Sequence, residues 1–152
     1  MSGKVLKVGL YWRKSKYFGG LCPPGVFTLT NERISFTTEE GTLFDVRLSD
    51  ARASLSGFGT LTVYSADQSW DLLATAGQES RTFTRAQQRE LGAAGAKKPD
   101  VAAGTKPVRD LAAVLSARGM SVDIRKNINL YVLYGAIGLA VATLIAVLLL
   151  SR

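Results

Sequence analysis

Few residues of this sequence are able to do chemistry, and most of those are basic. The chain contains no histidine and only one cysteine, Cys22. Without histidine, the Ser-His-Asp and Cys-His forms of catalysis, imidazole metal ligands and the usual general base near neutral pH are missing. A single cysteine forms no internal disulfide and no cysteine-cluster zinc site. We expect Cys22 to be an ordinary buried or half-buried thiol of a reducing compartment.

The carboxylates and glycines form no recognisable catalytic or phosphate-binding motif. Glu39-Glu40, Asp67 and Asp71 fall in predicted turns or on strand surfaces, as expected of a solvated edge. The stretch Gly57-Phe58-Gly59 lacks the lysine and the strand-to-helix setting of a phosphate-binding loop, so we interpret it as a turn between strands. The sequence therefore predicts a protein that is not an enzyme and has no cofactor or metal.

A basic and aromatic segment at the start of the chain is the strongest candidate for binding. Lysine and arginine outnumber aspartate and glutamate by 19 to 12, and the first 20 residues contain no acid. Near a bilayer each basic residue gains about 1 kcal/mol from anionic lipid, and aromatic side chains settle at the interface. The alternative is a lysine-protected edge strand with its aromatic residues in the core. The candidate lipid- or partner-binding residues are Lys4, Lys7, Trp12, Arg13, Lys14 and Lys16.

The residues from Lys4 to Trp12 fit two kinds of element. As a strand, they place Leu6, Val8 and Leu10 on one face. A basic amphipathic helix is the alternative for the same residues.

The stretch GVFTLTNERISF, residues 25–36, predicts an antiparallel hairpin. Apolar and polar residues alternate on both sides of a break at Asn31-Glu32, which gives the hairpin one dry face. A two-residue turn and a four-residue loop give the same pairing of the arms. We expect Phe27 opposite Phe36 and Leu29 opposite Ile34 in the core, with Asn31, Glu32 and Arg33 as turn residues.

Further elements follow from the same kind of pattern. Alternation bounded by turn residues predicts strands over 42–48, 59–65, 69–75 and 80–84. From Arg85 the composition favours a helix, and residues 92–106, rich in glycine, alanine and charge, predict a loop or linker. Residues 107–119 predict a helix with Pro107 in its first turn and Gly119 at its end, and residues 120–124 predict a short strand. The apolar face of that helix contains Val108, Leu111, Ala112 and Leu115.

A glycine, a short strand, the triplet LTN, a charged pair and an apolar strand ending in phenylalanine follow one another in residues 25–36. This arrangement resembles the GRAM and bacterial PH-like domains, with Gly25, Leu29, Thr30, Asn31, Arg33 and Phe36 at the resembling positions. The resemblance implies a PH-type barrel that begins with this hairpin, ends with a helix across one open end, and takes a lipid or peptide ligand. The domain would comprise a barrel over 1–91, the loop or linker 92–106, and a helix and strand over 107–126.

The end of the sequence predicts a transmembrane helix. Residues 130–150 contain no charge and no proline, and a helix of that length spans about 30 Å, the thickness of a bilayer's hydrocarbon core. Several basic residues precede the segment and only Ser151 and Arg152 follow it, so the positive-inside rule places the N-terminal domain in the cytoplasm. Small residues in the segment recur at a spacing that lets another helix approach closely. These helix-packing candidates are Gly135, Gly138, Ala142 and Ala146.

Taken together, these patterns predict a mainly β protein with a small PH-like antiparallel barrel, a C-terminal helix and one transmembrane α-helix. We expect a non-catalytic adaptor at the inner face of a bacterial plasma membrane, whose cytoplasmic domain recognises a protein or an anionic lipid surface. The alternative is an accessory subunit of an inner-membrane complex, held through its transmembrane helix. The membrane tether makes nucleic acid an unexpected partner.

Overall fold

Most elements of the chain are β-strands in the computed structural model, which describes residues 5–14, 21–75, 82–96 and 101–125. The strands are β1 (Leu6–Arg13), β2 (Pro24–Leu29), β3 (Arg33–Thr38), β4 (Gly41–Arg47), β5 (Ala51–Leu55), β6 (Thr60–Ser65), β7 (Gln68–Leu73) and β8 (Ser121–Ile124). The helices are α1 (Arg85–Ala93) and α2 (Lys106–Ala117), with short 3-10 turns η1 (Leu48–Asp50) and η2 (Val101–Ala103).

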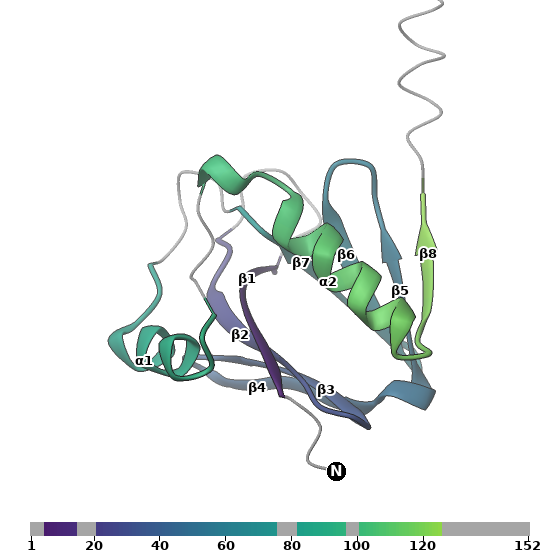
Figure 1. Ribbon diagram of the computed structural model, residues 1–152, viewed down its shortest axis with the longest axis horizontal. Helices are drawn as coiled ribbons and strands as arrows, with labels where there is room; N and C mark the ends of the chain where they lie inside the picture. The colour runs from purple at the N-terminus through teal and green to yellow at the C-terminus, as the bar shows by residue number, and fades with distance from the viewer. Residues whose placement is uncertain (1–4, 15–20, 76–81, 97–100, 126–152) are drawn as a thin grey trace, which may run out of the picture.

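The described strands form one sheet in the order β4-β3-β2-β1-β7-β6-β5-β8. Figure 1 shows this sheet bending between β2–β4 at the bottom and β5–β8 at the right, with α2 lying diagonally in front. Helix α2 packs on β5, β6 and β8, whereas α1 packs on β1 and β2. The predicted antiparallel pairing does not hold at one edge, because β8 follows a helix and pairs in parallel with β5. No pairing between described residues joins β4 to β8, so the sheet is open between its two edges.

Strands β2 and β3 form the predicted hairpin. Phe27 pairs with Phe36 and Leu29 with Ile34, and all four side chains are completely buried. They pack with Phe44 of β4 and with α2 in one core. Full burial of such a side chain stabilises the fold by about 1.5–3 kcal/mol. The alternation in the sequence therefore determines which face of the hairpin lies inside.

The glycine that opens the hairpin is required by close packing. A Cβ atom on Gly25 would lie 2.5 Å from Cζ of Phe36 and 2.7 Å from the carbonyl oxygen of Thr37. Contacts this short do not occur in folded proteins, and the carbonyl belongs to the backbone of the neighbouring strand, so it does not move aside readily. Gly25 thus lets β2 approach the ring of Phe36.

Helix α2 closes the core as the sequence predicts. It begins at Lys106, with Pro107 in the first turn, and Gly119 follows its end with φ +87°. Its 12 residues make it about 18 Å long. The start of the helix lies by the β5–β6 turn, where a Cβ atom on Gly59 would meet the Thr105 side chain. The predicted apolar face is buried and comprises Val108, Leu111, Ala112 and Leu115.

Helix α1 is held at both its cap and its side. The Thr84 hydroxyl accepts a hydrogen bond from the backbone N–H of Gln87 at 3.2 Å, and the Gln87 amide oxygen accepts one from the N–H of Thr84 at 2.9 Å. This reciprocal cap satisfies two donors that the first turn leaves without partners. The buried Gln87 side chain also donates to the carbonyl oxygen of Pro24 at 3.0 Å, which joins α1 to β2.

The basic segment near the start of the chain forms strand β1, as one of the two predictions for it states, and this strand is not at the edge of the sheet. Strand β1 pairs with β2 from Leu6 to Tyr11 and with β7 from Tyr11 to Arg13. It therefore lies in the middle of the sheet. The prediction of a strand is confirmed, whereas the basic helix and the edge position are wrong. The two strands of the β2–β3 hairpin lie between β4 and β1 in the sheet.

Two further strand predictions differ from the structure. In the segment predicted as strand 80–84, the described residues 82–84 are irregular, and Thr84 caps α1. Conversely, β5 was not predicted, because its inward-facing Ala51 and Ala53 give a weak apolar signal. Alanine is depleted in strands, and here it is accepted because α2 lies close against β5.

Among residues 5–14, 21–75, 82–96 and 101–125, no helix is both long enough and apolar enough to cross a membrane. The transmembrane segment predicted at 130–150 lies outside the described residues, and so do its packing candidates Gly135, Gly138, Ala142 and Ala146.

Candidate binding surfaces

The basic and aromatic residues predicted to bind a lipid or a partner lie on or directly after β1. Lys7, Trp12 and Arg13 belong to β1, and Lys14 follows it. Successive side chains of a strand point to opposite faces, so Lys7 and Arg13 share a face, while Trp12 takes the other and packs against the core. The two remaining candidates, Lys4 and Lys16, lie outside the described residues.

Lys7 is engaged by α1. Its Nζ lies 2.6 Å from Oε1 of Glu90, and only a quarter of its side chain is exposed, 25%. Ion pairs near the surface contribute little to stability, about 1 kcal/mol or less. The pair nevertheless neutralises Lys7 locally and fastens α1 to the middle of the sheet, which leaves less of its charge for an external ligand.

Arg13 is engaged by the neighbouring strands. Its Nη2 donates to Oδ2 of Asp71 at 2.5 Å, and Oδ1 of the same carboxylate accepts from the Thr62 hydroxyl at 2.7 Å. The Nε of Arg13 is buried, without a hydrogen-bond partner in the described part of the chain. The guanidinium therefore lies against the sheet, across β1, β7 and β6, in a largely structural position.

Lys14 is the most exposed of the described basic candidates. Its Nζ lies 5.7 Å from the centroid of the Trp12 ring and 3.7 Å from Oε2 of Glu40. The Lys14 side chain is 58% exposed. An ion pair of that length and exposure is weak, so Lys14, with the indole beneath it, keeps a charge that an anionic surface can reach.

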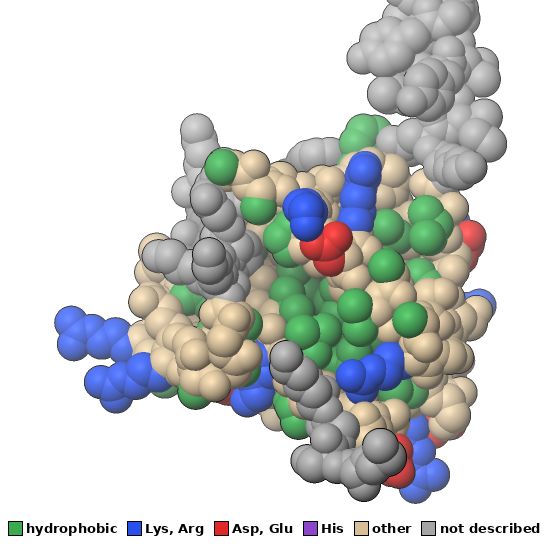
Figure 2. All heavy atoms as spheres, in the orientation of Figure 1, with side chains coloured by type: hydrophobic (Ala, Val, Ile, Leu, Met, Phe, Trp, Pro, Cys, Tyr) green, Lys and Arg blue, Asp and Glu red, His purple; other side chains and the backbone are tan. Residues whose placement is uncertain are grey.

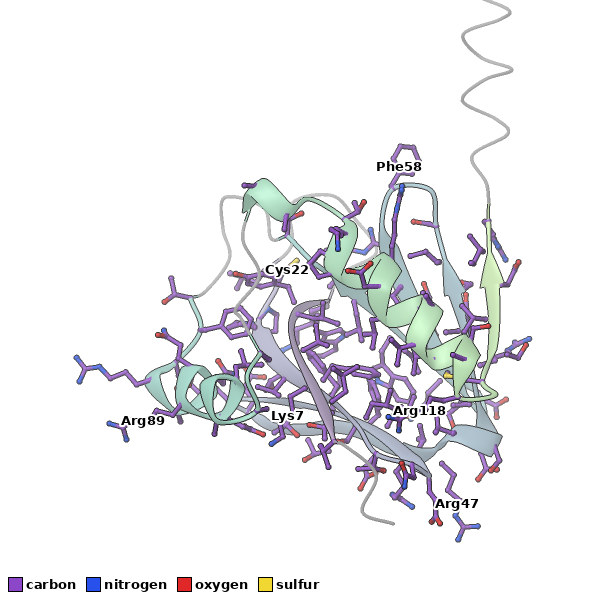
Figure 3. All side chains as sticks on the ribbon, in the orientation of Figure 1. Lys7, Cys22, Arg47, Phe58, Arg89 and Arg118 are labelled. Atoms are coloured by element: carbon purple, nitrogen blue, oxygen red, sulfur yellow. The ribbon has the colours of Figure 1, made fainter. Side chains whose placement is uncertain are left out.

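A second group of basic residues lines an open hollow at the end of α2, and the sequence interpretation did not single it out. The hollow has a volume of about 600 Å³. We call it the arginine hollow; its lining residues are Asn31, Glu32, Arg33, Arg47, Leu48, Ser49 and Arg118. Figure 3 shows Arg47 and Arg118 toward the lower right of the molecule, at the end opposite Phe58.

Hydrogen bonds fix the wall of the arginine hollow. The Thr30 N–H donates to the Arg33 carbonyl oxygen at 2.9 Å, and the Arg33 N–H donates to the Thr30 hydroxyl at 3.0 Å, which closes the β2–β3 turn. The N–H of Leu48 donates to the carbonyl oxygen of Glu32 at 2.8 Å. From α2, Nη1 of Arg118 donates to the Thr30 carbonyl oxygen at 3.1 Å. Three segments distant in sequence thus meet at the hollow.

The charges of the arginine hollow are unevenly compensated. Arg33 donates from Nε to Oδ1 of Asp45 at 2.8 Å. Arg47 stands directly across from Arg33 in the β3–β4 pairing, and like charges at directly opposed positions destabilise a sheet. In the part of the chain that the structure describes, the Arg47 side chain makes no ion pair or hydrogen bond.

Part of the arginine hollow has a signal in the sequence. Once the two strands are paired through Phe36 and Phe44, Arg33 and Arg47 fall near the same end of the pair. A count that starts from the β3–β4 turn instead meets a register shift between Phe36 and Thr37 and misaligns the two arginines by one residue. The approach of Arg118 depends on how α2 docks, which no local pattern gives.

Catalytic and metal chemistry find little support in the described residues. No group of three or more His, Cys, Asp or Glu side chains within them is placed to hold a metal ion. Cys22 is buried, as the sequence predicts, with 7% of its surface exposed. Burial raises the pKa of its thiol, and the positive charge of Arg13 opposes that shift in part. A thiol with a raised pKa is a poor nucleophile at neutral pH.

Comparison with known proteins gives a structural likeness and no sequence match. No family model and no curated protein matches the chain. Among solved structures, it is similar to the solution structure of the N-terminal PH domain of the human ARAP2 protein, with a TM-score of 0.38 and 16% sequence identity. That match covers 52% of this chain and 70% of the ARAP2 domain.

Proposed function

We propose that this chain is a non-catalytic binding protein, with a PH/GRAM-like domain held at the cytoplasmic face of a membrane by residues 130–150. The observation that carries the proposal is the short connection between the domain and that apolar segment. Strand β8 ends at Ile124, so only residues 125–129 lie between the sheet and Leu130. A chain of that length reaches at most roughly 20 Å. The domain would therefore sit against the headgroups.

The end of the domain nearest the apolar segment is suited to a membrane surface. Phe58, at the tip of the β5–β6 turn, is 74% exposed, and Ile124 is 58% exposed. Arg125 is fixed beside them, because its N–H donates to the carbonyl oxygen of Leu55 at 2.9 Å. Exposed aromatic and apolar side chains next to basic residues are typical of membrane interfaces. Figure 3 shows Phe58 projecting from the top of the domain.

The PH/GRAM-like assignment is supported by two features of the architecture. The hairpin of residues 25–36 has the predicted pairing, and α2 lies across the opening of the curved sheet, as the sequence resemblance implies (Figure 1). Within this proposal, the domain recognises a protein or an anionic lipid surface. Lys14 is the main lipid-contact candidate among the described residues, because Lys7 and Arg13 are paired with carboxylates.

Carbonate extraction tests the anchor. The full chain is expected to stay with the membrane fraction at alkaline pH, because an inserted apolar segment resists extraction. A chain truncated after Lys126 is expected in the supernatant. Release of the full chain by carbonate contradicts the proposed anchoring.

Vesicle flotation tests the lipid contact. A fragment of residues 1–126, once a cooperative thermal transition shows that it is folded, is expected to float with anionic vesicles at low salt and not with neutral ones. Lys14→Gln should reduce flotation, whereas Arg89→Gln, which removes an exposed charge from α1, should leave it nearly unchanged. If Lys14→Gln and Arg89→Gln reduce flotation equally, binding depends on net charge and not on a contact at Lys14. If the parent fragment does not float with anionic vesicles, the domain does not recognise lipid.

A second candidate function is that of an accessory subunit in a membrane complex. It is favoured by the recurrence of small residues in the apolar segment, which lets a partner helix approach closely. Gly138→Ile and Ala142→Ile are expected to change the proteins that co-purify with the full chain in mild detergent. An unchanged set of co-purifying proteins excludes these residues as the interface.

A further inference from the structure

We infer that the arginine hollow binds an acidic segment of a partner protein through its aspartate or glutamate side chains. Two arginines oppose each other at the arginine hollow. Arg33 and Arg47 are directly opposed on the outer face of β3 and β4, and one nearby carboxylate, Asp45, is already hydrogen bonded to Arg33. A carboxylate supplied from outside would relieve this opposition of like charges.

A third arginine of the hollow, Arg118, is preorganised. Arg118 is held by the Thr30 carbonyl oxygen and by Oδ1 of Asn31, at 3.1 and 3.2 Å. Its guanidinium is therefore fixed beside the hollow before any ligand arrives, and little side-chain entropy remains to be lost on binding. Guanidinium groups bind carboxylates through two parallel hydrogen bonds, and the Arg47 guanidinium, which makes no ion pair or hydrogen bond within the described residues, lines the same hollow.

The size and the mixed lining of the arginine hollow favour a polypeptide ligand. A volume of about 600 Å³ is much larger than a single carboxylate or phosphate needs. Glu32 also lines the hollow. Its carboxylate repels a dense polyanion but accepts hydrogen bonds from peptide N–H groups, which a polypeptide offers and a phosphate lacks. A polypeptide with spaced acidic side chains fits this lining better than a phosphate cluster does.

The position of the arginine hollow also favours a protein partner, an inference that rests on the proposed membrane anchoring. Arg118 and the arginine hollow lie at the far end of α2 from the β5–β6 turn, a helix length of about 18 Å. Ile124 pairs with Leu55 beside that turn, so the connection to the apolar segment starts at the opposite end from the hollow. If the hollow were turned toward the same membrane, residues 125–129 would have to run along the full length of the domain. That distance, about 18 Å for α2 alone, is nearly the whole reach of these five residues. The hollow therefore faces away from the bilayer, where proteins rather than lipids are available.

Figure 2 agrees with a localised site rather than a uniformly basic surface. On the face that it shows, blue side chains lie over α1 and near the two ends of α2, with green side chains between them. The arginine hollow is one of the places where arginine side chains line a concave surface.

Fluorescence anisotropy on the full chain in neutral detergent tests the inference. The probe is a short fluorescein-labelled peptide in which glutamate alternates with serine, and its control has glutamine in place of glutamate. Arg47→Gln is expected to weaken binding by about tenfold or more, because it removes a charge-assisted contact. Arg47→Lys is expected to be intermediate, since it keeps the charge and loses the two-pronged geometry. Arg89→Gln, the matched control, is expected to change the Kd less than about twofold, as rim charges do.

Three results would overturn the inference. These are no binding by the parent chain at low salt, equal losses for Arg47→Gln and Arg89→Gln, and Arg47-dependent binding of a soluble inositol trisphosphate without binding of the acidic peptide. The last result would assign the hollow to a phosphate group. Carbonate extraction tests the membrane anchor independently of peptide binding. A chain that is released by carbonate but binds the peptide through Arg47 would refute the proposed anchoring and would still support the acidic-peptide site.

Discussion

Arg118, the residue that ends α2, donates a hydrogen bond from Nη1 to the carbonyl oxygen of Thr30 at 3.1 Å. The same nitrogen donates to Oδ1 of Asn31 at 3.2 Å. One guanidinium therefore joins the last turn of the closing helix to the β2–β3 turn, although 88 residues of sequence separate Arg118 from Thr30. This contact both fixes the helix against the sheet and sets the wall of the arginine hollow.

Arg118→Ala is expected to lower the free energy of unfolding by about 1–2 kcal/mol, because it leaves a half-buried carbonyl oxygen without its charged donor. Urea denaturation of the full chain in neutral detergent, followed by tryptophan fluorescence, measures the change. Arg109→Ala, on the exposed side of α2, is the control and should stay within about 0.5 kcal/mol of the parent. Equal stability of the two variants would show that the Arg118 contacts contribute nothing.

Gly25→Ala is expected to destabilise the fold by more than about 2 kcal/mol, because overpacking displaces backbone as well as side chain. The new Cβ would meet both the Phe36 ring and the Thr37 carbonyl oxygen. Gly92→Ala is the matched control: it lies in α1 with nothing within 4 Å of its added Cβ. There the substitution should stabilise by up to about 1 kcal/mol. Thermal denaturation of both variants measures the two changes. A lower unfolding temperature for both would contradict the prediction that only the close packing around Gly25 requires glycine.

The hairpin was predictable because its information is local. Phe27, Leu29, Ile34 and Phe36 alternate with polar residues around a turn, and pairing follows from that pattern alone. Helix α2 was predictable for the same reason, since its apolar residues recur at helical spacing. Strand β5 was not, because Ala51 and Ala53 carry almost no apolar signal and are accepted there only through the approach of α2.

The candidate site was less predictable than the fold. The sequence draws attention to the basic residues near its start, but it does not show that Glu90 and Asp71 lie beside Lys7 and Arg13. These pairings depend on long-range docking of α1 and β7. Likewise, Arg33 was interpretable as a turn residue, while its position opposite Arg47 depends on a register shift within β3.

Arg13→Gln is expected to lower the stability of the fold, whereas Lys14→Gln is expected to lower vesicle binding and leave stability nearly unchanged. Arg13→Gln removes the partner of a half-buried carboxylate that also binds Thr62, so stability should fall by about 1–3 kcal/mol. Lys14→Gln removes an exposed charge, so stability should change by less than about 0.5 kcal/mol while flotation with anionic vesicles declines. Thermal denaturation and flotation of both variants give the two readouts. A large stability loss in Lys14→Gln would contradict this division.

The buried Cys22 thiol is expected to make stability fall in alkaline solution. Burial raises the thiol pKa of the folded state above its ordinary value of 9.0, so the folded state keeps its proton to a higher pH than the unfolded chain does. The stabilisation is therefore complete below the ordinary pKa and is lost as pH rises through the folded pKa. Cys22→Ala should flatten this part of the profile in urea denaturation. An identical slope in parent and variant would assign the decline to other groups.

Arg47→Glu is expected to raise stability and abolish acidic-peptide binding together. In the parent, Arg47 faces Arg33 across β3 and β4, and its side chain makes no ion pair or hydrogen bond within the described residues. Reversing its charge converts a repulsive cross-strand pair into an attractive one, which should stabilise the sheet by about 0.2–1 kcal/mol. The same change places a second carboxylate beside Glu32 in the arginine hollow and should repel the glutamate peptide.

This combination distinguishes a binding site from a structural arginine. If Arg47 served the fold, its reversal would lower the unfolding temperature, and any loss of peptide binding would follow from the damaged domain. If Arg47→Glu instead raises the unfolding temperature and abolishes binding, the opposed arginines destabilise the sheet and serve peptide binding. Arg89→Glu, on the exposed surface of α1, is the control for net charge and should leave both the unfolding temperature and the peptide Kd close to those of the parent.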